Sequence, residues 1–499
     1  MSATITDKFK RNLLDFLWNS YNDSSDHYYV GISRAEAWNE VDDLPPVPYP
    51  DRETVRTFQS SLQAVKQVTD LSYVVPRQNW SAGSIYTAWS DKNHSDTTVG
   101  GLRDIDGPYY VITDDHNVYV CLQQGATDEG TVRNSIYKPT DISTEPFAAG
   151  PDGYIWKFLY NVGTYNSRRY LTSQWMPVEH IYDSSQGGPS PDALSASRLA
   201  QYLAQTDAVP GQVLGIEVIN GGNGYTSAPS IYINGECVDS AFAYARVNDN
   251  NEVFQVVMKD SEDGEFKMGS GYGEKTWITV NGGGGQGAEL RPIVHRDSGG
   301  LGFDPRNDLN SSSLMYSVRL IADEYKIFNI KNDFRQVGLI RNPLKDSTNT
   351  DAFVGDSHFT GVRGTALKKI FVGTGIYEDK TDMDNLVTGL SSGATAYLDY
   401  YDIRVDSDCC DSTQNATQNI LYVHQTPETG FKPFDHGEVV ELSDGGGLAT
   451  IISHDDSDVP AMRFAHVDNF SGEVLFIDNR IQIDRDEDQT EDVKLIIDL

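Results

Sequence analysis

The chain contains 499 residues, enough for roughly three domains. It carries 39 Lys and Arg against 73 Asp and Glu, a net charge of −34, and a surface this acidic repels DNA, RNA and anionic membranes. We therefore expect no nucleic-acid partner, and because no apolar run reaches about 18 residues we expect no membrane span.

Helical periodicity is confined to three segments. The first begins after a possible N-cap at Thr6 or Asp7, the second begins after Pro50 with Asp51 as its cap, and the third covers residues 192–204. We expect a short helix in each. The apolar positions that share a helical face are Phe9, Leu13, Phe16 and Leu17 in the first helix and Val55, Phe58, Leu62 and Val65 in the second.

The remaining chain alternates apolar and polar residues between turn-forming segments. Residues 109–122 (YYVITDDHNVYVCL) and 155–162 (IWKFLYNV) are typical of strands. With 27 Tyr and 44 Gly the composition favours strands and turns. The sequence therefore predicts a mainly β protein with a few peripheral helices.

Residues 209–299 contain an internal duplication. GYTSAPSIYING begins at Gly224 and GYGEKTWITVNG begins at Gly271, an offset of 47 residues, and the same offset relates Ser240 to Gly287 at the start of SAFAYARV and GAELRPIV. Asn234-Gly235 and Asn281-Gly282 keep the offset too. Three matched blocks at one spacing indicate two copies of a small β unit, in which Gly supplies positive φ at turns. A looser similarity relates residues 390–401 to residues 443–454.

Three glycine-rich motifs imitate catalytic signatures without their context. GSGYGEKT (269–276) places Glu274 where a phosphate-binding loop needs Gly, and a strand pattern follows it. GGGGQG (282–287) precedes Pro292 instead of a helix that could bind a pyrophosphate. GLSSG (389–393) is followed by a strand pattern, so Ser391 is expected in a hairpin turn and not at a nucleophile elbow.

The other reactive residue types show no site spacing. The ten His are scattered, and the acidic clusters at 378–385 and 484–492 do not fit a calcium loop. We predict no catalytic, cofactor-binding or metal residues, although among 73 acids a carboxylate pair for glycoside hydrolysis remains an open alternative. The cysteines, at 121, 237, 409 and 410, form neither a disulfide framework nor a zinc motif, which indicates folding in a reducing compartment, and no secretory signal is recognised.

Several separated stretches resemble, in the same order, the β-sandwich baseplate wedge protein of T-even-type contractile-tailed phages. They are FLWNSYNDSSDHYYVGISRAEAWN (16–39), PPVPYPD (45–51), YVVPRQNW (73–80), GPDGYIWKFLYNV (150–162), GFDPRNDL (302–309), FRQVGLIRNPL (334–344) and the C-terminal residues 471–499. The resemblance implies a multilayer β-sandwich, a homodimer and a place beside other baseplate wedge subunits. It implies a non-enzymatic structural protein, folded in the host cytoplasm and located in the virion's tail baseplate, that contributes to baseplate assembly and tail contraction during infection.

The resemblance also predicts the domain organisation. Residues 1–208, 300–366 and 461–499 match the family and would form a discontinuous core, while 209–299 (the duplicated unit) and 367–460 would be two inserted β domains. If 209–299 is an independent outgrowth, its replacement by a Gly/Ser linker should leave a folded core. The dimer should meet through apolar, less acidic segments and not through DRDEDQTED (484–492), because like charges repel.

Two other function classes stay open. One is a virion carbohydrate-binding or host-attachment protein, for which an aromatic platform on the inserts would be the signature. The other is a polysaccharide-degrading tail enzyme, for which the expected long β-helix repeat is missing from the sequence. The candidate platform residues are Tyr225, Tyr232, Tyr272 and Trp277, although core packing is the more common role for such aromatics and is favoured here.

Overall fold

The computed structural model describes residues 6–38, 44–91, 108–182, 188–261, 264–295, 299–321, 327–328, 333–347, 357–376, 385–404, 418–452, 460–463, 465–486 and 489–499. The protein is mainly β, with 41% strand, 13% helix and six sheets in the described residues, which confirms the predicted fold class. The described chain divides into two compact units. Unit 1 comprises residues 1–14, 72–315 and 496–499, and unit 2 comprises residues 15–71 and 316–495. The predicted core and inserts follow other boundaries and stay a prediction.

Four elements contain a unit boundary: α1 (Asp7–Asn22), β3 (Asp70–Pro76), β15 (Ser313–Ile321) and β26 (Thr490–Asp498). The last three belong to a four-stranded sheet of order β26-β15-β3-β8, where β8 spans Trp175–Val178.

Unit 1 contains an aromatic core on the sheet β4-β5-β7-β6. Trp156 of the central strand β7 is fully buried between Tyr86 and Tyr154, and α4 lies against β7. β4, β5 and β7 follow the alternating stretches at 109–122 and 155–162, whereas β6 and α3 were not predicted. The elements are β4 (Tyr110–Ile112), β5 (Asn117–Gln123), β6 (Phe147–Ala148), β7 (Ile155–Asn161), α3 (Gly163–Tyr170), the 3-10 turn η2 (Pro191–Ala193), α4 (Ala196–Thr206) and α5 (Pro305–Asp308).

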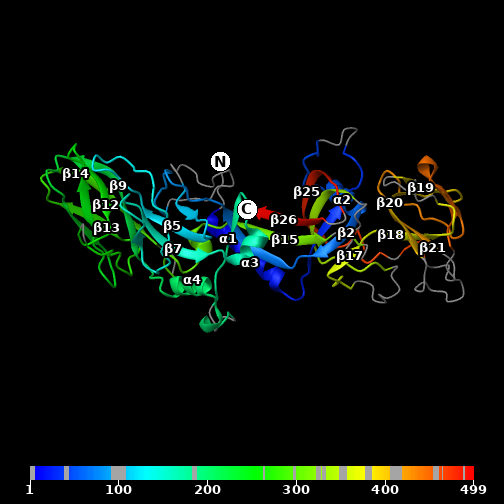
Figure 1. The fold of residues 1–499 in the computed structure, drawn as a ribbon, viewed down its shortest axis with the longest axis horizontal. Coiled ribbons are helices and arrows are strands. Elements are labelled where there is room, and N and C mark those ends of the chain that lie inside the picture. Colours follow the sequence, from blue (N-terminus) through cyan, green and yellow to red (C-terminus); the bar gives the residue numbers. More distant parts are fainter. Residues whose placement is uncertain are drawn as a thin grey trace. The chain divides into compact units, whose positions relative to one another are not determined.

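Residues 213–294 of unit 1 form six strands, which we call the module; Figure 1 shows β9, β12, β13 and β14 together. They make a four-stranded sheet of order β12-β11-β10-β13 and a two-stranded sheet β14-β9. The two sheets touch where β13 meets β14 and where β9 meets β12. The strands are β9 (Val213–Asn223), β10 (Ser230–Asn234), β11 (Tyr244–Val247), β12 (Val253–Val257), β13 (Trp277–Asn281) and β14 (Gln286–Val294).

The 47-residue offset is visible in the module's geometry. Gly222 has φ +68°, and a Cβ there would lie 2.5 Å from the backbone N of Ala288. Gly269, 47 residues later, has φ +60°, and a Cβ there would lie 2.6 Å from the backbone N of Ala241, which is itself 47 residues before Ala288. Each copy thus makes the same close backbone approach to the other, and only glycine fits at either point.

Strands of the two copies pair with each other. β10 and β13, which are equivalent under the offset, are neighbours, so that Tyr232 lies opposite Thr279 and Ser230 opposite Asn281. β9 of the first copy pairs with β14 of the second. β11 of the first copy lies between β10 of the same copy and β12, which follows the first copy's matched blocks. Both sheets of the module therefore contain strands from both copies.

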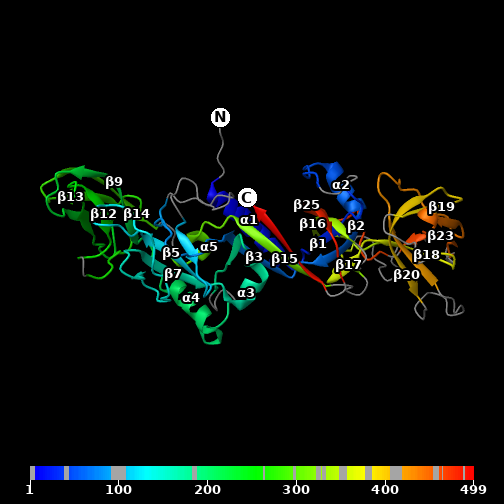
Figure 2. The same ribbon diagram turned by 45° about the horizontal axis from the view of Figure 1, so that its top comes forward.

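Unit 2 contains a five-stranded sheet of order β17-β2-β1-β16-β25, covered on one face by α2 (Figure 2). Phe58 of α2 is fully buried, and a Cβ at Gly338 would come within 2.4 Å of its ring, so the helix packs closely because the strand carries Gly. The elements are β1 (Tyr28–Ser33), α2 (Arg52–Ser60), β2 (Leu62–Gln67), β16 (Phe334–Arg341), β17 (Arg363–Thr365) and β25 (Glu473–Ile483).

A second sheet of unit 2 has seven strands in the order β23-β22-β19-β20-β21-β18-β24. Its apolar core includes Ile370, Val387, Leu421 and Val440, none of which is exposed. The elements are β18 (Lys368–Val372), β19 (Leu386–Gly389), β20 (Thr395–Arg404), β21 (Gln418–His424), β22 (Val439–Leu442), the 3-10 turn η5 (Ser443–Gly445), β23 (Gly447–Thr450) and β24 (Met462–Arg463).

The predicted helices are found, with one correction. The carboxylate of Asp51 accepts from Thr54 N at 2.8 Å and caps α2, as predicted. The helix ends at Ser60, however, and Leu62 and Val65 lie in β2, where pairing with β1 replaces the helical continuation that their spacing suggested. The third predicted helix is α4, preceded by η2.

Candidate interaction surfaces and cavities

The first candidate surface is an apolar stripe on α1. Phe9, Leu13 and Phe16 follow each other at helical spacing and are 59%, 40% and 60% exposed, whereas Leu14 is fully buried. The predicted helix is therefore confirmed, but much of the apolar face that predicted it lies in solvent. A helical stripe of this kind is a surface on which another helix or protein can pack.

The charge of α1 differs from that of the whole chain. The helix carries three basic residues, Lys8, Lys10 and Arg11, against the two acids Asp7 and Asp15, in a chain whose net charge is −34. A second copy could approach this helix without the repulsion that most of the surface would impose.

A second exposed apolar segment lies at residues 44–49. Leu44, Val47 and Tyr49 are each more than 70% exposed, and the segment, which has no regular secondary structure, contains prolines at 45, 46, 48 and 50. The Asn479 side chain donates to the carbonyl of Pro46 at 2.8 Å and ties this segment to β25. An exposed, proline-rich segment of this kind is suited to protein contacts.

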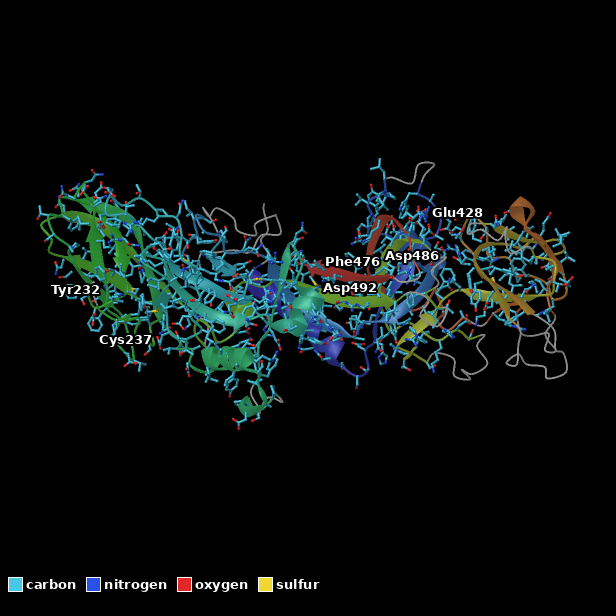
Figure 3. All side chains as sticks on the ribbon, viewed as in Figure 1. Tyr232, Cys237, Glu428, Phe476, Asp486 and Asp492 are labelled. Atoms are coloured by element: carbon cyan, nitrogen blue, oxygen red, sulfur yellow. The ribbon has the colours of Figure 1, made fainter. Side chains whose placement is uncertain are left out.

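The four predicted platform aromatics divide into two pairs. Tyr225 and Tyr272, equivalent under the 47-residue offset, are buried, and the Tyr272 hydroxyl accepts from Ala241 N at 2.9 Å. Tyr232 and Trp277 are 52% and 57% exposed (Tyr232 is labelled in Figure 3). Core packing thus accounts for the first pair only.

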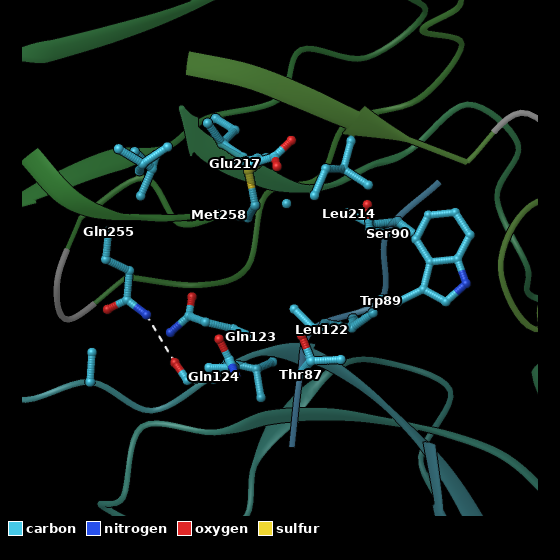
Figure 4. Close-up of a pocket in the computed structure, with 18 of the residues that line it drawn as sticks. Thr87, Trp89, Ser90, Leu122, Gln123, Gln124, Leu214, Glu217, Gln255 and Met258 are labelled. Atoms are coloured by element: carbon cyan, nitrogen blue, oxygen red, sulfur yellow. Dashed lines mark hydrogen bonds between the residues drawn. The ribbon is translucent and has the colours of Figure 1, made fainter. Parts of the chain in front are cut away.

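A cavity of about 420 Å³ lies in unit 1 between the module and the β5 strand (Figure 4). Its wall includes Trp89 and Met258 and three glutamines whose side-chain amides are held by backbone carbonyls. Gln123 Nε2 donates to Gly153 O, Gln124 Nε2 to Tyr86 O, and Gln255 Nε2 to Gln124 O at 2.9 Å, the bond drawn in Figure 4.

The cavity is poor in reactive groups. Of the described residues that line it, only Glu217 is ionisable, and its carboxylate accepts from Arg291. Arg291 also pairs with Asp91 at 2.7 Å, so the module is joined to the 84–91 segment by an ion-paired network. The wall can hold an uncharged ligand by apolar contact and amide oxygens, but it offers no matched acid and base.

A second cavity of about 500 Å³ contains His295, Ser270 and Glu274 in its wall. His295 Nε2 lies 3.1 Å from Asp308 Oδ1, and both side chains are buried. Burial raises the pKa of Asp308, against the lowering effect of His295. The Ser270 hydroxyl donates to Asp239 Oδ2 at 2.8 Å instead of to His295, so a Ser-His-Asp relay is not assembled here.

Ser391 and Glu274 occupy the settings that their local sequences predicted. Ser391 lies in the turn between β19 and β20, and its backbone N donates to Glu438 Oε2 at 3.1 Å. Glu274 is exposed, and the chain after it enters β13 and not a helix. In the GGGGQG motif, residues 282–285 connect β13 to β14, and Gln286 and Gly287 begin β14.

A buried ionic triad in unit 2 was not predicted. His424 Nδ1 lies 2.6 Å from Asp399 Oδ2, and His424 Nε2 lies 2.6 Å from Glu36 Oε1. Burial alone would lower the pKa of His424, but the two carboxylates raise it to about 10, so the ring is protonated at neutral pH. No local pattern could reveal the triad, because Glu36 and His424 are 388 residues apart in the chain.

Among the residues that the structure describes, no group of three or more His, Cys, Asp or Glu is placed to hold a metal ion. In the second acidic cluster, Arg485 pairs with Glu491 at 3.0 Å; the first cluster falls almost wholly outside the described residues, as do Cys409 and Cys410. Of the other cysteines, Cys121 is buried and Cys237 exposed, and both are free. No helix in the described part of the chain is long and apolar enough to cross a membrane.

No family model and no curated protein matches this chain.

Proposed function

We propose that this protein is a non-catalytic structural subunit of a phage tail baseplate wedge, which works in the virion as a homodimer among other wedge subunits. The proposal starts from the ordered sequence resemblance to the β-sandwich wedge protein of T-even-type phages. A mainly β chain with exposed apolar segments suits an assembly subunit of this kind.

One observation carries the proposal: stretches that resemble the family and lie far apart in the chain are neighbouring strands. β1 from the first stretch pairs with β16 from the FRQVGLIRNPL stretch, with Gly31 opposite Gly338. β16 pairs in turn with β25 from the C-terminal stretch, with Leu339 opposite Phe476. β1 and β16 are about 300 residues apart in the chain and β16 and β25 more than 130. Distant segments that keep the family's order and share one sheet are what a common core would produce.

The apolar stripe of α1 is the contact that we propose for the dimer. It is exposed, apolar and flanked by more basic than acidic residues. A stable interface buries about 1,200–2,000 Å² in total, so the stripe would be its centre and other surface would complete it.

Light scattering at micromolar concentration tests the dimer. We expect the mass of a dimer for the full chain and of a monomer for Phe16→Glu, because a carboxylate would be buried in an apolar contact. Tyr165→Glu changes an equally exposed aromatic on α3 and should leave the dimer intact. A monomeric wild type would remove the dimer, and failure of wedge proteins from the same phage to co-purify with the chain would remove the baseplate role.

The alternative function, a polysaccharide-degrading enzyme, predicts catalytic activity, whereas the structural role predicts none. A glycoside hydrolase typically uses two carboxylates at the scissile bond, whereas Glu217, paired with Arg291, is the one carboxylate among the described residues that line the 420 Å³ cavity. Release of reducing sugar from host polysaccharide by the pure protein, abolished by Glu217→Gln, would favour that alternative.

A further inference from the structure

The outward face of the β10–β13 pair carries two large aromatic side chains in a polar surrounding. We propose that this face binds uncharged carbohydrate through stacking on Tyr232 and Trp277. The inference stands apart from the wedge proposal, since a subunit of any virion or cell-surface assembly could carry such a site. The face consists of Ser230, Tyr232, Asn234, Trp277, Thr279 and Asn281.

The strand register places both rings on one side of the sheet. Tyr232 lies opposite Thr279 and Asn234 opposite Trp277, so the two aromatics are diagonal neighbours on adjacent strands. Residues on these strands alternate between exposed and half-buried, with Tyr232 and Trp277 among the exposed ones. A diagonal pair is separated by about 7–8 Å, which large side chains can span, so the two rings can form one platform.

The internal duplication shows that the fold does not require these aromatics. At the positions that shape the module, both copies carry the same residue: Gly222 and Gly269 at the close backbone approach, Tyr225 and Tyr272 in the core. At the outward positions, Asn234 and Asn281 are the same residue in both copies, and the other two positions differ. Tyr232 corresponds to Thr279 and Trp277 corresponds to Ser230 under the same offset. Each aromatic therefore stands where the other copy folds with a small polar residue.

The residue types on this face favour an uncharged ligand over a charged one. None of its six residues is charged, although the chain has a net charge of −34, and a face without Lys or Arg offers nothing to phosphate or carboxylate groups. Asn234 Nδ2 donates to Thr279 Oγ1 at 3.0 Å and to Tyr232 O at 3.1 Å, so the amide between the rings is held in place. Flat rings that meet the C–H face of a pyranose, with amide and hydroxyl groups for its hydroxyls, suit an uncharged sugar.

Affinity electrophoresis of the full chain tests the proposal. Native gels would contain the uncharged polysaccharides xyloglucan, galactomannan or dextran, with the anionic polymer hyaluronate as the charged control. We expect at least one uncharged polymer to retard the wild type and hyaluronate to leave it unretarded. Trp277→Ser and Tyr232→Thr copy the residues that the fold already accepts at the equivalent positions, and each should weaken binding at least fivefold. Tyr232→Phe keeps the ring and should bind like the wild type, as should Tyr165→Ala, which removes an exposed tyrosine outside the module.

Three outcomes would overturn the proposal. They are a wild type that none of the three uncharged polymers retards, ring-deleting variants that bind like the wild type, and equal binding to hyaluronate. If Trp277→Ser instead lowers the mass of the protein in solution, the face is a contact between copies of the chain. Coincident thermal melting of the variants and the wild type would show that any loss of binding is local.

Discussion

The module (213–294) lies within the predicted insert 209–299, and all strands of the seven-stranded sheet except β24 lie within the predicted insert 367–460, yet the two regions are stabilised in different ways. The module depends on backbone fit: paired glycines with positive φ let two copies approach closely, and its central strands are exposed or half-buried throughout. The seven-stranded sheet has a continuous apolar core whose members include Ile370, Leu421 and Val440, and the buried triad of His424, Asp399 and Glu36 lies at its β20–β21 strands.

The difference indicates which kind of substitution should destabilise each region most. A region held by side-chain burial is most sensitive to the loss of a partner inside it, because an unpaired buried charge keeps its full desolvation cost. A region held by backbone approach is most sensitive to a single added Cβ. The contrast would be wrong if removing a buried partner had little effect on the seven-stranded sheet, or if an added Cβ had little effect on the module.

The largest effect is expected at the triad. His424→Ala would leave the carboxylates of Asp399 and Glu36 without the cation between them, and we expect a loss of about 3–5 kcal/mol in the free energy of unfolding of unit 2. Urea unfolding followed by tyrosine and tryptophan fluorescence would measure it. His424→Gln retains a hydrogen-bonding side chain without the charge and should lose less; a loss below about 1 kcal/mol for the alanine variant would contradict the importance of the triad.

The same triad predicts a pH dependence. The pKa of His424 is raised in the folded state to about 10 from an ordinary value of 6.5. The group therefore stabilises the fold fully below about pH 6.5, and this contribution declines as the pH rises and is lost once it passes about 10. Urea midpoints measured between pH 6.5 and 10.5 should fall more steeply for the wild type than for His424→Gln, and parallel curves would refute the assignment.

A smaller effect is expected for the module's glycines. Gly222→Ala and Gly269→Ala would each force a Cβ toward the other copy's backbone at positive φ, and we expect each to cost about 1–3 kcal/mol. The two losses should be similar because the contacts are equivalent. Gly273→Ala is the matched control, since a Cβ there meets nothing within 4 Å. Thermal melting of unit 1 would compare the three, and unequal losses at the equivalent sites would argue against the symmetry.

The smallest effect concerns the turn that holds Ser391. Glu438 accepts from Ser392 N at 2.9 Å and from Asp435 N at 2.7 Å, and although burial raises its pKa, these bonds lower it on balance. Glu438→Gln should cost about 1–2 kcal/mol. The lowered pKa means that the stabilisation is present above the ordinary value and is lost as the pH falls through the folded value, so the variant and the wild type should converge in acid.

The sequence predicted local structure well wherever one strand or helix depends on its own residues. The alternation at residues 155–162 corresponds to β7, and the cap at Asp51 begins α2. The prediction was wrong where pairing with a distant strand determines the local structure. Leu62 and Val65 continue the helical spacing of α2, but they lie in β2 and pair with β1.

The candidate sites divide in the same way. The motifs around Glu274 and Ser391 could be judged from their neighbours, because a phosphate loop or a nucleophile elbow needs a helix directly after it. The exposure of Tyr232 against the burial of Tyr225 depends on how two copies pair, and the apolar positions of α1 indicated a helix without showing that Phe9 and Phe16 are exposed. In each case the sequence shows the spacing of the apolar or aromatic residues along a strand or helix. It does not show which other part of the protein covers them.

The pairing of β9 in the first copy of the module with β14 in the second has a consequence for synthesis on the ribosome. β11 pairs with β12, but β9 must wait for β14, whose first residue follows the last residue of β9 by more than 60 positions. At roughly 5–20 residues per second the ribosome needs several seconds to supply that partner. During that interval the edge of β9 is open, and a neighbouring nascent chain on the same message can present its own β14. The module is therefore a place where two growing chains could interlock by domain swapping before either is complete.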